Sequence, residues 1–339
     1  MEPELIYIIG NFLGSSLGQC PLRFKVQSFP RKTLAEKTMH IVKWTLFVST
    51  FLMTQCTQKS RRPSIGEDGH RGRYNLASDA KSIVFAAFGD MGTGSLDQYR
   101  VADALSKICQ QRGCEFVVGL GDSIYGRVSS VDDQQFAEKF EKPYQNIRIP
   151  FYMSLGNHDV TVDISPQIDY TDQSKKWRLP KEYYSFQAAN ANSSIEFWSI
   201  NTNPLTLAWQ QGQWLSAGIK NSEATWRVVF GHHPWKSNGH HGDASKTRQQ
   251  FFEDHFCHKV DFYLAGHDHD KQHLHAECGV HLAVIGTGAK LRPAATGKNS
   301  YYAVSSLGFA VFEMNKAVMV MDFYDEQGRL EYSSRFEKN

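Results

Sequence analysis

Six short apolar runs, each ending in glycine, constrain the fold of this chain most strongly. They are rich in β-branched and aromatic residues. Runs of this kind predict short strands that are buried on both faces. The six runs are SIVFAAFGD (82–90), CEFVVGLGD (114–122), IPFYMSLGNHD (149–159), WRVVFGHHP (226–234), VDFYLAGHDH (260–269) and VHLAVIGTG (280–288).

Amphipathic helices are predicted between these runs. In residues 95–113, Val101, Leu105 and Ile108 recur at helical spacing, and Gly113 follows at a C-cap position. Residues 132–145, stopped by Pro143, and residues 247–259 show the same kind of pattern. Alternation of strands and helices predicts right-handed crossovers and an α/β fold. The C-terminal segment 308–336 is expected to form an antiparallel hairpin with a further edge strand.

Polar residues suited to metal binding follow five of the six predicted strands. In open α/β sheets, ligands bind beyond the carboxyl ends of the strands, so loops from neighbouring strands can converge on one point. Taken singly, such an aspartate is also a common helix N-cap, and such an asparagine a common turn residue. The candidates are Asp90, Asp122, Tyr125, Asn157, His158, His232, His267 and His269.

Histidine is concentrated in one part of the chain. Of the 14 histidines, 11 lie between His232 and His281. Because histidine is the commonest metal-ligating side chain, this clustering indicates metal binding. Hydrolases with two metal ions hold them about 3.5–4 Å apart, which requires one bridging carboxylate. Asp122 is the natural bridge, and a phenolate from Tyr125 suits Fe(III).

The five motifs GD, GDxxY, GNHD, GHHP and GHDH occur here in the order found in the calcineurin-like metallophosphoesterase superfamily, and the chain resembles that superfamily. The GDxxY form is similar to that of the purple acid phosphatases, especially the small, single-domain, tartrate-resistant type. The resemblance covers most of residues 83–315. It implies a four-layer α/β/β/α sandwich with two mixed sheets flanked by helices.

The resemblance also implies roles for individual residues. Asp90, Asp122, Tyr125 and His269 are expected to hold Fe(III). Asn157, His232 and His267, with Asp122 as the bridge, are expected to hold a divalent ion, which is Fe, Zn or Mn. His158 and His241 match catalytic histidines that meet the substrate phosphate and the leaving group. The implied reaction is attack of a metal-bound hydroxide on phosphorus, with an imidazolium protonating the departing alkoxide.

Other residues near the motifs are not expected to bind metal. Asp268 is expected to orient a ligand without binding metal itself. His273 and His275 lie past the motif on a predicted strand and are expected to be structural. Met91 replaces a tryptophan of the mammalian enzymes and is expected to change the wall of the pocket.

The first eighty residues differ in composition from the rest. Residues 1–38 are interpreted as an upstream segment that does not belong to the protein, with Met39 as the start. Residues 39–56 combine Lys43, a short apolar run and Cys56, a pattern typical of a signal peptide and possibly of a lipoprotein signal. The alternatives are a buried helix or disorder. Residues 57–80 read as a polar linker, and residues 81–339 as the metallophosphoesterase domain.

This interpretation makes the protein exported, and periplasmic or anchored to the envelope by a lipid at Cys56 if the source is bacterial. In an oxidising compartment, Cys257 could pair with Cys278 and Cys109 with Cys114; buried free thiols are the alternative. The net charge of +2 gives no reason to expect a nucleic-acid partner. A monomer is expected.

The predicted function is an acid phosphatase that hydrolyses phosphate monoesters of small molecules. The same metal site would also serve a phosphodiesterase or a nucleotide phosphohydrolase. A third possibility is a binding protein built on an inactive phosphoesterase fold. That class would require lost ligands, and none of the expected ligands is missing from the sequence.

Overall fold

The structure is a computed structural model that describes residues 71–75, 81–203, 208–294, 297 and 299–338. These residues all belong to one compact unit, Ser64–Asn339. The segment 1–38, the predicted signal segment 39–56 with Cys56, and most of the predicted linker 57–80 lie outside the described residues.

The first of two sheets has seven strands in the order β15-β14-β13-β2-β3-β4-β5. Strands β2 to β5 run parallel, and β13 to β15 add an antiparallel half that joins β2 through β13. The strands are β2 (Ile83–Phe88), β3 (Phe116–Gly119), β4 (Phe151–Met153), β5 (Trp177–Arg178), β13 (Gly308–Met314), β14 (Val318–Asp325) and β15 (Leu330–Glu337).

The second sheet has eight strands in the order β1-β6-β7-β8-β9-β11-β10-β12. Its centre, β7-β8-β9-β11, is parallel. The strands are β1 (Arg71–Asn75), β6 (Tyr184–Ala189), β7 (Ser194–Ser199), β8 (Trp226–Phe230), β9 (Phe262–Ala265), β10 (Lys271–Glu277), β11 (Val280–Ile285) and β12 (Ser300–Val304).

The main core lies between the two sheets. Phe85 of β2 and Phe116 of β3 stack with their ring centroids 5.2 Å apart, and Phe197 of β7 meets both rings edge-on at 5.1 and 5.4 Å. All three side chains have no exposed surface. Because successive residues of a strand point to opposite faces, the neighbouring Trp198 of β7 lies in a second core on the outer side of its sheet.

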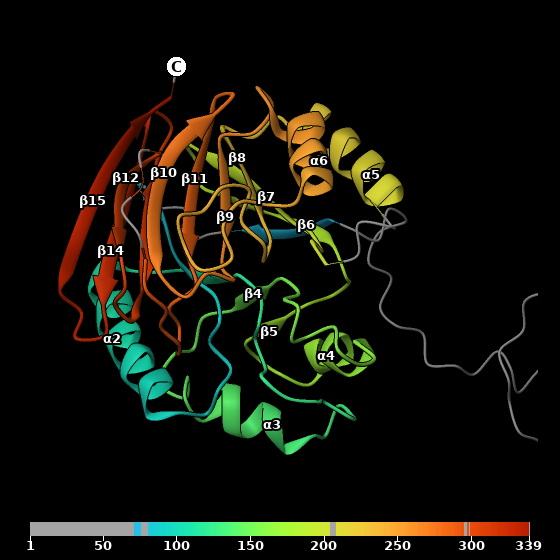
Figure 1. Ribbon diagram of the computed structural model, residues 1–339, viewed down its shortest axis with the longest axis vertical. Helices are drawn as coiled ribbons and strands as arrows, with labels where there is room; N and C mark the ends of the chain where they lie inside the picture. Colours follow the sequence, from blue (N-terminus) through green and yellow to red (C-terminus); the bar gives the residue numbers. More distant parts are fainter. Residues whose placement is uncertain (1–70, 76–80, 204–207, 295–296, 298, 339) are drawn as a thin grey trace, which may run out of the picture. The chain divides into compact units, whose positions relative to one another are not determined.

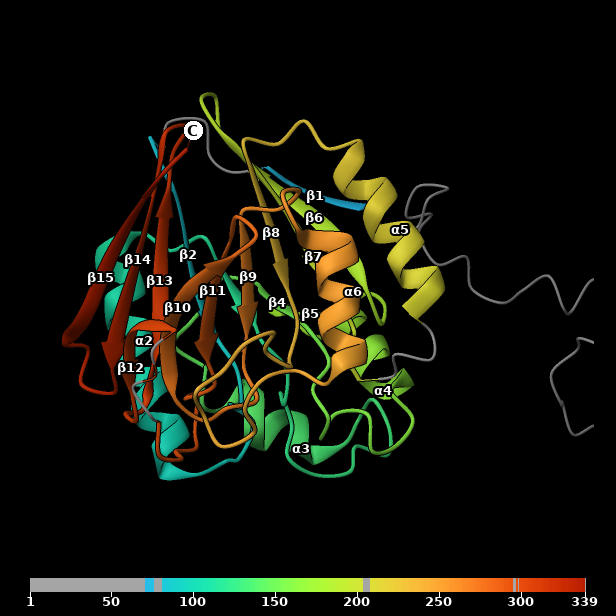
Figure 2. The ribbon, with the colours of Figure 1, turned by 45° about the horizontal axis from the view of Figure 1, so that its top comes forward.

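Helices cover the outer face of each sheet (Figures 1 and 2). Helix α2 (Leu96–Arg112) contacts β2 and β13, and helices α5 (Ala208–Lys220) and α6 (Lys246–Phe256) contact each other and the second core. Ser95 caps the start of α2, and Gly113 ends it in the left-handed conformation. The predicted α/β/β/α sandwich with two mixed sheets is confirmed.

The predicted helix at 132–145 is shorter and less regular than expected. It consists of α3 (Gln134–Phe136) followed by a π-helical turn, η1 (Ala137–Glu141), and it ends before Pro143. Two further short elements, α4 (Ser165–Asp169) and the 3₁₀ turn η2 (Tyr170–Asp172), follow in the next connection.

All six glycine-terminated runs form the predicted strands, as β2, β3, β4, β8, β9 and β11. Other elements have no counterpart in the prediction, notably α5 and the hairpin β6–β7. Arg71–Asn75, inside the segment predicted as a linker, pairs in parallel with β6 as strand β1.

Both cysteine pairs considered from the sequence are disulfides in this structure. Cys109–Cys114 closes the C-terminal end of α2, and Cys257–Cys278 joins the end of α6 to the turn between β10 and β11. Among the described residues, no helix is both long enough and apolar enough to span a bilayer.

Candidate metal centre

Loops at the carboxyl ends of strands from both sheets bring the predicted ligands together. Asp90, Asp122 and Asn157 follow β2, β3 and β4 of the first sheet, while His232 and His267 follow β8 and β9 of the second. The backbone bonds from Gly89 N to Ile285 O (2.8 Å) and from Gly288 N to Gly89 O (3.0 Å) tie the edges of the two sheets together here. The site therefore lies where the two sheets meet.

Three of these residues adopt backbone conformations that are rare for side chains other than glycine. The φ angles are 57° for Asp90, 51° for Asp122 and 70° for His267. A non-glycine residue in this left-handed region costs on the order of 1 kcal/mol or more, and such strain clusters at functional sites. These strained turns bring three candidate ligands to the site.

Glycines let the backbone approach two of the carboxylates closely. A Cβ atom on Gly156 would lie 2.1 Å from Oδ1 of Asp122, and one on Gly266 would lie 2.6 Å from Oδ2 of Asp90. Any side chain at these two positions would displace a candidate ligand. The glycines that end the β4 and β9 runs are therefore part of the site's construction.

One group of donors forms around Asp90. Its Oδ1 accepts a hydrogen bond of 2.9 Å from the hydroxyl of Tyr125 and lies 3.2 Å from Nε2 of His269. The hydroxyl and Nε2 are themselves 3.4 Å apart. A second bond, 2.8 Å long, from the backbone N–H of His267 to Oδ2 fixes the Asp90 carboxylate. These three side chains match the predicted Fe(III) ligands, apart from the shared Asp122.

A second group of donors forms around His232. Its Nδ1 lies 2.8 Å from the carbonyl oxygen of Leu120. A carbonyl oxygen only accepts, so Nδ1 carries a proton, and in the neutral imidazole Nε2 presents a lone pair. That lone pair lies 3.0 Å from Oδ1 of Asn157 and 3.1 Å from Nδ1 of His267. These three residues match the predicted divalent site.

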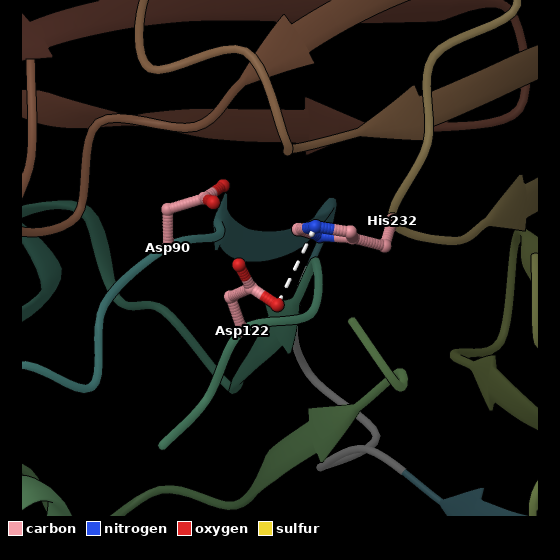
Figure 3. Close-up of side chains that lie close together, drawn as sticks. All are labelled: Asp90, Asp122 and His232. Atoms are coloured by element: carbon pink, nitrogen blue, oxygen red, sulfur yellow. Dashed lines mark ion pairs between the residues drawn. The ribbon is translucent and has the colours of Figure 1, made fainter. Parts of the chain in front are cut away.

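Asp122 lies between the two groups. Figure 3 shows Asp90, Asp122 and His232 turned toward one another. Each of the three has a ligand atom within 4.8 Å of the others. Oδ1 of Asp122 is 3.5 Å from Nε2 of His232, and it accepts a 2.9 Å hydrogen bond from the backbone N–H of His158. Asp122 thus lies where a bridging ligand would need to lie.

The donor chemistry fits a cation. When His232 is neutral and Asp122 is ionised, Nε2 of His232, Oδ1 of Asn157 and Oδ1 of Asp122 carry no hydrogen, yet the first lies 3.0 and 3.5 Å from the other two. Three such acceptors repel one another unless a positive ion lies between them. Asp90, Asp122 and His232 are also buried almost completely, at 0%, 2% and 0% exposure.

The pKa values of the side chains in this site also favour binding of a cation. Burial raises the pKa of Asp90 to about 8, with the negative charge of Asp122 acting in the same direction and His232 opposing it. Burial lowers the pKa of His269 to about 4 and brings that of His267 far below its usual range. Burial and the neighbouring Asp90 also raise the pKa of Tyr125 strongly. A bound cation would favour the ionised carboxylates and the phenolate.

The two predicted catalytic histidines lie on either side of the donor groups. His158 is exposed, its Nε2 is 4.0 Å from Oδ2 of Asp122, and its ring lies 4.6 Å from that of Tyr125. His241 is also exposed and stacks on His267 with ring centroids 4.1 Å apart. Burial lowers the pKa of His241, Arg292 adds to that effect, and Asp268 opposes it.

Asp268 supports the loop of His241. It has no exposed surface, accepts a 2.8 Å bond from the backbone N–H of His241 at Oδ1, and accepts a hydrogen bond from the hydroxyl of Ser237 at Oδ2. The sequence predicted that Asp268 orients a ligand; the structure shows it holding the segment that carries His241.

Asp159 has a positioning role that the sequence analysis did not assign. Its buried carboxylate accepts bonds of 3.1 Å from Ser123 N, 3.2 Å from Ile124 N and 2.8 Å from Gly156 N. It therefore joins the loop of Asp122 to the loop of Asn157. Its place at the end of the GNHD motif was the available signal.

Two cations next to the site were also missed. Lys290 places Nζ 3.5 Å from the centre of the Tyr125 ring, and Nη1 of Arg292 donates a 2.8 Å bond to Nε2 of His241. Both follow the sixth apolar run, which the sequence analysis treated as a strand without a site residue. This run ends in glycine like the other five, and that shared feature could have indicated that site residues follow it.

The expectation for Met91 is wrong. Met91 has no exposed surface and belongs to the main core, so it contributes nothing to the wall of a pocket. His273 and His275 lie on β10, as predicted. His273 is buried and pairs with the Tyr332 hydroxyl at 2.8 Å, away from the donor groups.

Comparison with known proteins gives a consistent result. The profile of the calcineurin-like phosphoesterase family matches residues 83–271. Tartrate-resistant acid phosphatase type 5 of Oryctolagus cuniculus is 28% identical over 297 residues, which covers 76% of this chain and 91% of the relative. Purple acid phosphatase 4 of Arabidopsis thaliana is 26% identical over 73% of this chain and 81% of the relative.

Solved structures share the fold. Purple acid phosphatase PPD1 from yellow lupin (Lupinus luteus) seeds aligns with a TM-score of 0.62 and 14% identity, over 77% of this chain and 55% of that one. GAP50, described as the anchor in the inner membrane complex of Plasmodium, aligns with a TM-score of 0.68 and 19% identity, over 77% of this chain and 90% of that one. At these identities the likeness shows the fold alone.

Proposed function

Because the chain belongs to the calcineurin-like phosphoesterase family, a family of hydrolases that act on phosphate esters, we propose that it is an acid phosphatase with a two-metal centre that hydrolyses phosphate monoesters. The named acid phosphatases among its relatives support this activity. The observation that carries the two-metal proposal is the position of Asp122 between two separate groups of donors.

The proposed ligand sets follow the two groups. Asp90, Tyr125 and His269 hold Fe(III), and Asn157, His232 and His267 hold a divalent ion, with Asp122 shared. A phenolate and two carboxylates are hard, anionic ligands that suit a trivalent cation. The second set, with two neutral imidazoles and one amide, suits a divalent cation. When bound, the two ions supply Lewis-acid chemistry to the phosphate ester.

The protein's own residues complete the reaction. His241 is exposed beside His267, within reach of the leaving group of an ester placed between the donor groups. In its protonated form it donates a proton to the departing alkoxide. His158, above Asp122 and Tyr125, binds an oxygen of the phosphate. Asp268 and Asp159 accept backbone hydrogen bonds that hold these loops in position.

Metal content and colour test the proposed centre. The purified full chain should contain iron and a second metal and should absorb visible light through charge transfer from the Tyr125 phenolate to Fe(III). Tyr125→Phe should remove the colour and leave part of the phosphatase activity. Tyr301→Phe is the matched control, because Tyr301 is 61% exposed on β12 and should leave the colour unchanged. A colourless, fully active wild type that contains only divalent ions would reject the tyrosinate assignment.

A substrate panel tests the reaction. We expect phosphate monoesters to be hydrolysed at acidic pH with a kcat/KM well above that of phosphodiesters of the same alcohol. Faster hydrolysis of the diesters, or of nucleoside polyphosphates only, would reject monoester specificity while leaving the metal centre intact. No hydrolysis of any phosphate ester by metal-loaded protein would reject the enzymatic proposal and favour a binding protein.

We also propose that the protein is exported and acts as a monomer on a phosphorylated small molecule. Two disulfides within the described residues support an oxidising compartment. Identification of the mature N-terminus by mass spectrometry, with cell fractionation, tests export and lipid attachment at Cys56. An intact N-terminus on protein from the cytoplasm would reject both.

A further inference from the structure

Two cations from one loop reach the edge of the metal centre. The loop follows β11, and a 2.9 Å bond from the backbone N–H of Arg292 to the carbonyl of His269 anchors it to the metal-site loop. Lys290 holds Nζ 3.5 Å from the centre of the Tyr125 ring, and Arg292 holds Nη1 2.8 Å from Nε2 of His241. The loop therefore places positive charge beside both a candidate metal ligand and the candidate acid.

Neither cation has an anionic partner among the described residues. Within the part of the chain that the structure describes, other half-buried or buried cations pair with carboxylates, such as Lys176 with Glu141 at 3.1 Å, or donate to backbone carbonyls, such as Arg178 to Ser174 at 2.9 Å and Arg227 to Ser222 at 3.0 Å. Lys290 and Arg292 are half-buried and form no ion pair among the same residues. A partly desolvated cation without a counter-charge is unfavourable, which points to an anionic ligand.

The position of Arg292 indicates which part of a substrate it would meet. The scissile phosphate is placed between the two donor groups. His241, as the proposed proton donor, faces the leaving group. Because Arg292 contacts His241, it lies on the leaving-group side. The guanidinium fork suits a carboxylate or phosphate better than the single lone pair of an imidazole.

We infer that the preferred substrate is a phosphate monoester whose leaving group carries a second anionic group, a carboxylate or a phosphate, and that Arg292 and Lys290 bind this group. The inference rests on the proposed function for the position of the scissile phosphate. In this state Arg292 donates to His241; on substrate binding it donates to the second anion, while Lys290 contributes charge from above the Tyr125 ring.

Binding of matched, non-hydrolysable ligands gives the direct test. Propylphosphonate and 3-phosphonopropionate have the same chain length and differ in a terminal methyl or carboxylate, and 1,2-ethylenediphosphonate replaces the carboxylate with a phosphonate. Calorimetry on the metal-loaded full chain should show tighter binding of the two ligands that carry a second anionic group, and their order identifies the preferred second anion. Arg292→Gln should reduce the preference about tenfold, as expected for loss of one charge-assisted hydrogen bond.

Two further variants make the test specific. Arg292→Lys keeps the charge but loses the fork and should retain part of the preference. Lys316→Gln is the charge-matched control. Lys316 is exposed in the turn between β13 and β14, and the neighbouring Met314 pairs with Ile83 at the start of β2, the end opposite Asp90. This variant should leave the preference unchanged.

Kinetics separate failure of this inference from failure of the proposed function. Wild type should hydrolyse 3-phosphooxypropionate with a higher kcat/KM than propyl phosphate, and Arg292→Gln should bring the two values together. If neither ester is hydrolysed, the proposed function fails, while a preserved binding preference still supports the anion subsite. Equal losses on both ligands in Arg292→Gln would overturn the inference, because Arg292 would then serve only His241 or the metal centre.

Arg248 is a third cation near the site that has no carboxylate partner among the described residues, and it provides a further test. Arg248 lies on the other side of the site, where its Nε donates a 3.1 Å bond to the carbonyl of Thr202. If Arg248→Gln abolishes the preference for the ligands that carry a second anionic group and Arg292→Gln does not, the second anion binds on that side and the assignment to Arg292 and Lys290 is wrong.

Discussion

The imidazole of His241 stacks on that of His267, with ring centroids 4.1 Å apart and an angle of 25° between the planes. His267 belongs to the proposed divalent site, so the stacking fixes His241 beside a metal ligand. Burial lowers the pKa of His241. A general acid acts only while protonated, so activity that depends on His241 should fall as the pH rises through this lowered pKa.

We predict that His241→Asn slows the hydrolysis of alkyl phosphates by about 10²-fold or more, the lower end of general-acid catalysis. Nitrophenyl phosphate should be slowed much less, because its leaving group needs little protonation. The measurement is kcat/KM for both substrates in wild type and variant. Equal losses on both substrates would mean that His241 binds phosphate and donates no proton, which would leave His158 as the candidate acid.

Asp159 should control metal affinity without touching a metal. Its two oxygens accept backbone N–H bonds from the Asp122 and Asn157 loops, and the amide of Asp159→Asn would set an N–H against one of these donors. We expect a 10- to 100-fold loss of metal affinity, as is usual for residues that orient ligands. Competition with a chromogenic chelator measures it.

The control for this variant is Asp163→Asn. Asp163 is exposed and accepts its bonds from Ser165 in the same polypeptide segment, outside the two donor groups. Its substitution should leave metal affinity within about twofold. An equal loss in both variants would contradict a specific role for Asp159.

Removal of the metals should make stability depend on pH. Burial raises the pKa of Asp90 and of Asp159 to about 8, so in the metal-free protein both carboxyls keep their protons near neutrality, while in the unfolded chain they lose them above about pH 4. Between about pH 6.5 and 8 the unfolded state therefore binds fewer protons, and the free energy of unfolding falls as the pH rises. His267 and His269, whose pKa values are lowered, contribute only below about pH 6.5, where unfolded histidines are protonated.

Each carboxyl with a raised pKa should lower the free energy of unfolding by on the order of 1 kcal/mol between pH 6.5 and pH 8. Urea unfolding of chelator-treated protein at pH 6.5 and pH 8 measures the loss. Reloading with iron and a divalent metal should restore more stability at pH 8 than at pH 6.5, since cations favour the ionised carboxylates. A metal-free protein with equal stability at the two pH values would contradict the raised pKa values.

The two disulfides should differ in their contribution to stability. Cys257–Cys278 spans 21 positions of the sequence and encloses β9 with the His267 and His269 loop, whereas Cys109–Cys114 spans 5. Because a disulfide restricts the unfolded chain more when it closes a longer loop, the Cys257→Ser/Cys278→Ser double variant should lose about 1 kcal/mol more than the Cys109→Ser/Cys114→Ser variant. Denaturant unfolding of non-reduced protein measures both, and the opposite order would contradict the loop-length argument.

The strands and the ligand set were accessible from the sequence. Apolar runs such as 83–88 and 262–265 form strands because their side chains must be buried on both faces, and this property is local. The residues that follow them, from Asp90 to His269, meet at one site because parallel strands bring their carboxyl ends to one edge. The α/β class and the candidate site residues therefore followed from pattern and order, and the resemblance to a known family assigned seven of them as ligands.

Only the tertiary structure decided which residues surround that site. The β6–β7 hairpin and α5 have weaker patterns; β7 pairs with β8, and α5 shares the second core with Trp198 and Val229. Met91 is a core residue because the turn at Asp90 directs it inward, which no spacing rule reports.

The contacts that assemble the site join residues far apart in the chain. Asp122 lies beside His232, and Arg292 reaches His241, because of the paths of the loops and the meeting of the two sheets. The sequence by itself determined the residue types that could bind metal and the strands that carry them. The order of strands within and between sheets decided which of those residues became neighbours, because that order is set by the burial of the shared core and not by local preference.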